Sequence, residues 1–107
     1  MLVLLENGAP RGIALALVGH AVTECRERGW DGLANGELLT AAESAGFEVL
    51  VTTDKNIRYQ QNLAGRRIAI VVLGKARWRL IRPMLAEVVA AVNSVKPGSY
   101  TEVDIPG

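Results

Sequence analysis

The segment 47–56 constrains the fold of this chain more than any other stretch. Its central run, 49–52, is short, mostly β-branched and almost entirely apolar, and Asp54 follows two residues later. A continuous run of this kind is typical of a strand that is buried on both faces, as in a parallel sheet. A carboxylate that follows such a strand emerges at the edge of the sheet, where open α/β sheets bind their ligands. Asp54 therefore lies where a functional site is expected.

Apolar runs alternate with helical patterns along the whole chain. Strands are predicted at 2–5, 21–25, 49–52, 68–73 and 100–105, and helices at 10–18, from an Asn35 N-cap to 46, at 57–63, and from the region of Pro83 to 94. This alternation predicts an α/β fold with helices on both faces of a five-stranded, mainly parallel sheet. We expect the strand order 2-1-3-4-5, with the most apolar strands inside and the last strand at an edge, in either direction.

Length and composition narrow the class of protein. The 107 residues predict one domain, 1–107, and half of them are hydrophobic, which allows a real core. The net charge of +1 gives the chain no overall basic character. Cys25 is the one cysteine, which excludes an intrachain disulfide and favours a reducing, cytoplasmic location. The first residues resemble neither a signal peptide nor a membrane span, so no membrane association is expected.

Three carboxylates are expected at one edge of the sheet. Glu6 follows the first strand, Asp54 follows the third, and Glu37 lies in the first turn of the helix between them, with Asn56 just beyond Asp54. In a β-α-β unit the helix starts at the carboxyl end of the preceding strand, so these residues should converge near the topological switch point. Carboxylates without a histidine or cysteine partner repel one another unless a hard cation joins them, and Mg²⁺ or Mn²⁺ suits oxygen ligands.

Each of these residues also has a simpler structural explanation. Glu37 near a helix N-terminus interacts favourably with the helix dipole. Asp54 or Asn56 could cap the short helix predicted after them, and Glu6 could simply end a strand. Sequence alone leaves both explanations open.

The segment 55–86 contains no carboxylate and is rich in basic residues. Those expected at the acidic edge are Lys55, Arg58, Lys75, Arg77, Arg79 and Arg82. A carboxylate pocket flanked by basic residues suits a metal-dependent enzyme that acts on a phosphodiester, because Lys and Arg can hold the flanking backbone. Trp30, Tyr59 and Trp78 are expected near the same edge and could stack on bases. The alternative is a solvated basic face with aromatic residues that only pack.

Several motifs resemble those of a known family. They are Leu5-Glu6-Asn7-Gly8-Ala9-Pro10, Asn35-Gly36-Glu37-Leu38-Leu39, Thr52-Thr53-Asp54-Lys55-Asn56 and Tyr59-Gln60-Gln61-Asn62. Together they are similar to the short PIN-like proteins, which are small prokaryotic relatives of PIN-domain ribonucleases. The resemblance implies a three-layer, PIN-like α/β/α fold, a divalent-metal site and frequent membership of toxin–antitoxin pairs. It places the family's acidic positions on Glu6, Glu37 and Asp54, with Asn56 as an auxiliary, although the family usually has aspartate where Glu6 stands.

The leading hypothesis is therefore a Mg²⁺- or Mn²⁺-dependent endoribonuclease, the toxin of a toxin–antitoxin pair. Glu6 and Asp54 would bind the metal, Glu37 would complete the shell or orient a water, and Asn56 would support them. The residues expected to contact RNA are Lys55, Arg58, Lys75, Arg77 and Arg79.

Other functions and partners stay open. One alternative is a catalytically inactive RNA- or protein-binding module on the same fold. Another is a phosphoacceptor domain with Asp54 as the acceptor, which ranks last because no lysine follows Ile105. The partners expected are RNA, an antitoxin protein and a second copy of the chain, because the edge strand 100–105 would be unpaired in a monomer.

Overall fold

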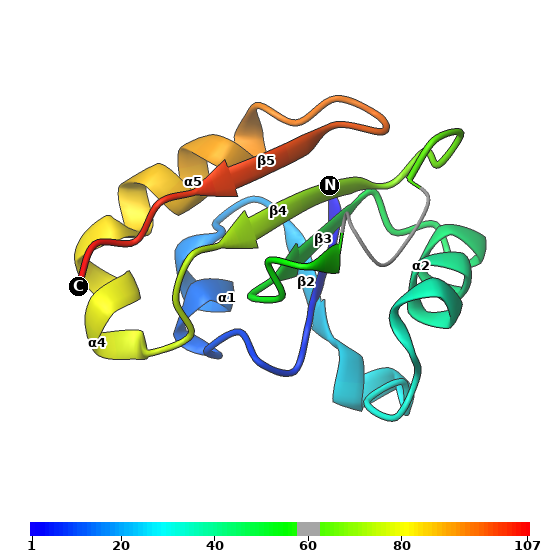
Figure 1. Ribbon diagram of the computed structural model, residues 1–107, viewed down its shortest axis with the longest axis horizontal. Helices are drawn as coiled ribbons and strands as arrows, with labels where there is room; N and C mark the ends of the chain where they lie inside the picture. Colours follow the sequence, from blue (N-terminus) through cyan, green and yellow to red (C-terminus); the bar gives the residue numbers. More distant parts are fainter. Residues whose placement is uncertain (58–62) are drawn as a thin grey trace.

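The computed structural model describes residues 1–57 and 63–107, and its five strands form one parallel sheet (Figure 1). The strands are β1 (Leu2–Leu5), β2 (Ala21–Glu24), β3 (Val49–Thr52), β4 (Ala69–Leu73) and β5 (Tyr100–Val103). Their order in the sheet is β2-β1-β3-β4-β5, which confirms the predicted order and the interior position of the three most apolar strands. The direction of the last strand, which the sequence left open, is parallel to β4.

Helical segments connect the strands, and some differ from the predicted lengths. The segments are α1 (Gly12–Ala16), η1 (Cys25–Arg28), α2 (Asn35–Ser44), α4 (Trp78–Ile81), η2 (Arg82–Met84) and α5 (Leu85–Asn93). The last predicted helix is divided, because Pro83 lacks a backbone N–H and its ring disfavours a continuous α-helix, so a 3₁₀ turn separates α4 from α5. Most of the helix predicted at 57–63 falls outside the described residues.

Alternating strand residues build two cores, one on each face of the sheet. Residues such as Leu5 and Val51 pack with α1, α4 and α5, whereas Leu4 and Leu50 pack with α2 on the opposite face. Figure 1 shows α2 on one side of the sheet and α1, α4 and α5 on the other side. The arrangement is a three-layer α/β/α sandwich, as predicted, and it explains why β3 and β4 are buried along their whole length.

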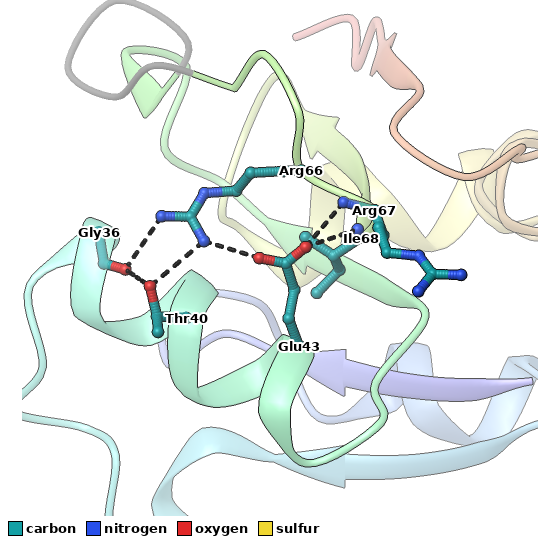
Figure 2. A network of polar contacts seen from close by, with 6 residues as sticks. All are labelled: Gly36, Thr40, Glu43, Arg66, Arg67 and Ile68. Atoms are coloured by element: carbon teal, nitrogen blue, oxygen red, sulfur yellow. Dashed lines mark hydrogen bonds and ion pairs between the residues drawn. The ribbon is translucent and has the colours of Figure 1, made fainter.

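A carboxylate on α2 fastens this helix to the start of β4 (Figure 2). Glu43 accepts hydrogen bonds from the Arg66 guanidinium at 2.7 Å and from the backbone N–H groups of Arg67 at 2.7 Å and Ile68 at 3.4 Å. Burial alone would raise the pKa of the Glu43 carboxyl, but these donors outweigh it and hold the pKa below its ordinary value of 4.5. The ionised form of Glu43 is therefore part of the folded structure.

Arg66 extends the same network to the beginning of α2. Its guanidinium donates to the Thr40 hydroxyl at 3.3 Å and to the Gly36 carbonyl at 3.4 Å, as Figure 2 shows. Its Nε is buried and has no hydrogen-bond partner in the described part of the chain. One arginine thus ties both ends of α2 to the β3–β4 connection, which fixes the helix along the sheet.

The network predicts a specific loss of stability for Glu43→Gln. The amide keeps the shape but removes the negative charge that accepts hydrogen bonds from the Arg66 guanidinium and from the backbone N–H groups of Arg67 and Ile68, so the free energy of unfolding at neutral pH should fall by about 1.5–3 kcal/mol. Urea denaturation of both proteins measures this difference.

The pH dependence of that difference follows from the lowered pKa. The contribution of Glu43 is fully present above the ordinary value of 4.5 and is lost as the pH falls through the lowered pKa of the folded state. The difference in the free energy of unfolding between wild type and Glu43→Gln should therefore shrink as the pH falls below 4.5. Glu87→Gln, on the exposed face of α5, is the matched control and should change stability by no more than about 1 kcal/mol. An equal loss for both variants would refute the role of Glu43.

Candidate functional site at the carboxyl edge of the sheet

The predicted site residue Glu6 lies beside Thr52 at the carboxyl edge of β1 and β3. Leu5 pairs with Val51, and the Glu6 N–H donates to the Val51 carbonyl at 2.9 Å, which continues the pairing one residue beyond β1. Because Leu4 and Leu50 face α2, the alternation of strand side chains directs Glu6 and Thr52 toward the same face. The sheet register therefore brings these two side chains together.

Thr52 links the Glu6 carboxylate to the backbone of Asp54. It is 1% exposed and is the only buried polar residue among those the structure describes. Its Oγ1 donates to Glu6 Oε1 at 3.1 Å and accepts the backbone N–H of Asp54 at 3.1 Å. A hydroxyl can do both at once, since it carries one hydrogen and two lone pairs. One buried side chain thus fixes residues that follow two adjacent strands.

The turn after β1 holds the other oxygen of Glu6. Glu6 Oε2 accepts the Gly8 N–H at 3.0 Å, and the Ala9 N–H closes the turn on the Glu6 carbonyl at 3.0 Å. A Cβ at position 8 would lie 2.7 Å from Thr53 Oγ1 and 3.4 Å from Glu6 Oε1, so a larger residue there would require the Thr53 side chain or the turn to shift. Both oxygens of Glu6 are oriented, and each retains a lone pair for another partner.

Asp54 is held equally well, and one of its partners was not predicted. Its Oδ1 accepts the Asn56 N–H at 2.9 Å, and its Oδ2 accepts the Asn35 side-chain amide at 2.9 Å. The prediction of Asn35 as the N-cap of α2 is wrong, because Ala34 has the extended N-cap conformation and Asn35 is the first helical residue. Asn35 is therefore the first residue of the helix, and its side-chain amide donates to Asp54 at the site.

Asn56 and Glu37 take local roles in the structure. Asn56 contacts Asp54 through its backbone N–H, while its side chain is exposed. Glu37 is also exposed, and its carboxylate accepts the Ala34 N–H at 3.4 Å, which is half of a capping box because alanine has no side-chain acceptor. The roles predicted for Glu37 and Asn56 at a metal stay predictions.

The donor set at this edge fits a hard cation that is bound by few protein ligands. In residues 1–57 and 63–107 no group of three or more His, Cys, Asp or Glu side chains is placed to hold a metal ion. Glu6 and Asp54, however, follow adjacent strands at one edge, and hydrogen bonds orient the carboxylate of each. Mg²⁺ usually takes one or two carboxylates, keeps several waters and adds substrate phosphates. Two carboxylates are therefore sufficient for this kind of site.

The basic residues predicted to contact RNA differ in their surroundings. Lys75, Arg77 and Arg79 are exposed in the connection after β4 and in α4, and Arg58 lies outside the described residues. Lys55 is exposed too, but it lines a shallow cavity of about 340 Å³ together with Glu102 and Asp104. These two acidic residues reach the edge because β5 runs parallel to β4. Their charge offsets that of Lys55, so Lys75, Arg77 and Arg79 are the better candidates.

The remaining reactive side chains have structural surroundings. Cys25 is buried, and desolvation, followed by the negative charges of Glu6 and Asp31, raises its pKa to about 11. Its thiol is therefore protonated at neutral pH and cannot act as a thiolate nucleophile. His20 lies between the N-terminal amine, 3.2 Å from Nδ1, and Asn93 Oδ1, 2.6 Å from Nε2, at the far end of the sheet.

Comparison of the chain with protein-family models, with curated proteins and with solved structures finds no match. The resemblance to short PIN-like proteins thus stays a prediction from the motifs. None of the described helices has the length and apolar character needed to cross a membrane.

Thr52→Val tests whether the buried hydroxyl organises the site. Valine fills nearly the same space but leaves the Asp54 N–H and Glu6 Oε1 without this partner, so the free energy of unfolding should fall by about 1–3 kcal/mol. Thr52→Ser keeps the hydroxyl and loses one methyl group, which should cost about 0.8 kcal/mol. In urea denaturation, wild type should be the most stable of the three proteins, Thr52→Ser should be intermediate and Thr52→Val should be the least stable. A serine variant less stable than the valine variant would contradict the role of the hydroxyl.

Proposed function

We propose that this chain is a Mg²⁺- or Mn²⁺-dependent endoribonuclease of PIN-like type, with Glu6 and Asp54 as the metal ligands. The observation that carries the proposal is that buried Thr52 hydrogen-bonds both the Glu6 carboxylate and the Asp54 backbone N–H, which places two hydrogen-bonded acidic residues after adjacent strands at the carboxyl edge of a parallel sheet. Ligands of open α/β sheets bind at this edge. The motifs that resemble short PIN-like proteins contain the same two acidic residues.

The chain's own residues would act by binding and orienting. Hydrogen bonds from Gly8 and Thr52 hold the Glu6 carboxylate, and those from Asn35 and Asn56 hold the Asp54 carboxylate. Such outer partners fix the direction of metal ligands and strongly affect metal affinity. A bound divalent cation supplies an activated water for attack on the phosphodiester and stabilises charge on the phosphate. Asn35 is thus a positioning residue in this proposal.

Substrate and partners follow from charge and from the resemblance. Lys75, Arg77 and Arg79 are exposed after β4, at the edge that bears the carboxylates, and would contact the phosphates of RNA. The motifs support two further parts of the proposal: the protein acts as a cytoplasmic toxin, and an antitoxin protein neutralises it. The predicted edge strand supports a homodimer.

A catalytically inactive RNA- or protein-binding module is the second candidate. It is favoured by the hydrogen bond between Glu37 and the Ala34 N–H, which gives the third acidic residue a capping role. The length of Glu6, one methylene longer than the aspartate usual in the family, favours it as well. Metal-dependent cleavage distinguishes the two candidates.

Asp54→Asn should abolish Mn²⁺-dependent cleavage of single-stranded RNA while the fold stays intact. The amide preserves the shape but removes the charge of a proposed metal ligand, and loss of a mere outer partner already costs about 10–100-fold. We therefore expect a loss of more than about 100-fold. The measurement is cleavage of a labelled RNA with Mn²⁺ and with EDTA, together with circular dichroism.

Two further variants control this experiment. Glu6→Asp should retain or raise activity, because it restores the side-chain length usual in the family. Glu48→Gln removes a carboxylate at the opposite edge of the sheet and should leave cleavage unchanged. Cleavage that survives EDTA, or that Asp54→Asn leaves intact, would rule out the proposed mechanism.

Replacing Arg77 and Arg79 together with alanine should weaken the salt dependence of RNA binding. Each lost phosphate contact should lower the slope of log affinity against log salt concentration by about one unit. In the matched control, alanine replaces Arg67 and Lys96, which are two exposed basic residues near the other edge of the sheet. Equal slopes for both double variants would show that the basic residues after β4 do not contact RNA.

A further inference from the structure

Trp78 is a partly exposed aromatic residue at the carboxyl edge of the sheet. It begins α4, has 37% of its surface exposed, and stands between the exposed residues Arg77 and Arg79. In Figure 1, α4 lies next to α1, beyond the end of β4. The side chain is therefore available to a ligand that also contacts these arginines.

Gly12, the first residue of α1, forms the surface on which the indole rests. A Cβ at position 12 would lie 2.4–2.7 Å from Cη2, Cζ2 and Cζ3 of Trp78, so any larger residue there would displace the ring. The φ angle of Gly12 is not positive, so the backbone conformation does not require glycine. Glycine is also a poor helix former. The contact with Trp78 is thus the physical reason for glycine at this position.

The other aromatic residues expected near this edge do not offer the same surface. Trp30 packs edge-on against Phe47, with ring centroids 5.9 Å apart, and the Arg28 guanidinium covers its ring at 4.7 Å. Tyr59 lies outside the described residues. Among the predicted stacking residues that the structure describes, Trp78 is the one that combines exposure with fixed orientation.

We infer that Trp78 is a stacking platform for an unpaired base of single-stranded RNA. This inference rests on the proposed RNA-binding function of the same edge and adds a subsite to it. The backbone at Gly12 limits the movement of one part of the indole, and the exposed residues Arg77 and Arg79, which precede and follow Trp78 in the sequence, are available to contact phosphates. Aromatic side chains beside basic residues bind single strands with little base preference, because every base has a π-face. A paired base in a duplex cannot stack in this way.

Tryptophan fluorescence provides a direct measurement. The chain has two tryptophans, so Trp30→Phe leaves Trp78 as the sole reporter. Single-stranded oligoadenylate, added in EDTA to prevent cleavage, should quench its fluorescence at saturation, whereas a duplex RNA of equal length should not. Because the titration needs no metal, its result is independent of catalysis.

Three substitutions separate stacking from packing. Trp78→Leu should lower the affinity for oligoadenylate about 5-fold to 150-fold, the range expected for one stacked base, without changing the salt slope. Trp78→Phe keeps a smaller ring and should lose less. Gly12→Ala displaces the indole but retains every charge and Trp78 itself, and it should also weaken binding. Leu15→Ser is the matched control, since it removes an apolar side chain, 86% exposed, from the same helix as Gly12.

Each contrary outcome has a defined meaning. Unquenched fluorescence with intact, arginine-dependent binding would make Trp78 a packing residue and leave the ribonuclease proposal standing. Equal losses of oligoadenylate affinity for Trp78→Leu and Leu15→Ser would show that the loss does not come from stacking on Trp78 and would overturn the inference. Failure of wild type to bind the oligonucleotide would overturn the inference and the proposed RNA binding together. Quenching without any Mn²⁺-dependent cleavage would support the subsite and refute the enzyme.

Discussion

Burial of β3 on both faces is the constraint on which the site depends. A strand between two helical layers can keep a polar side chain only if that side chain is fully hydrogen-bonded. Thr52, 1% exposed, meets this requirement with the Glu6 carboxylate on one side and the Asp54 N–H on the other. The hydrogen bonds that satisfy one buried hydroxyl therefore also set the positions of both acidic residues. The geometry of the site therefore depends on how the core packs around β3.

A second polar network holds the helix that completes the site. Glu43 and Arg66 connect α2 to the start of β4, far from the carboxylates, and Arg66 reaches back to the first turns of the helix at Gly36. Because α2 is fixed in this way, its first residue, Asn35, stays within hydrogen-bond distance of Asp54. The Glu43–Arg66 network at one edge of the sheet thus helps to position Asn35 at the opposite edge, where the proposed metal site lies.

Much of the fold was predictable because its determinants are local. The apolar runs specified the strands and their interior order, and the alternation of strands with helices specified parallel connections. The role of Asn35 was missed because the N-cap depends on backbone angles, and Ala34 takes them despite its poor capping side chain. The position of Glu102 and Asp104 beside Lys55 could not be predicted, because it depends on the direction of β5. The contact of Gly12 with Trp78 is likewise invisible without tertiary structure.

The central claim is that Glu6 and Asp54 bind one divalent cation, and Mn²⁺ binding to the metal-free protein tests it most directly. Calorimetric titration of wild type, Asp54→Asn and Glu37→Gln is the measurement. We predict one saturable site in wild type, its loss in Asp54→Asn, and its retention in Glu37→Gln, because the structure gives Glu37 a helix-capping hydrogen bond. Absence of binding by wild type, or binding that Asp54→Asn leaves unchanged, would contradict the account.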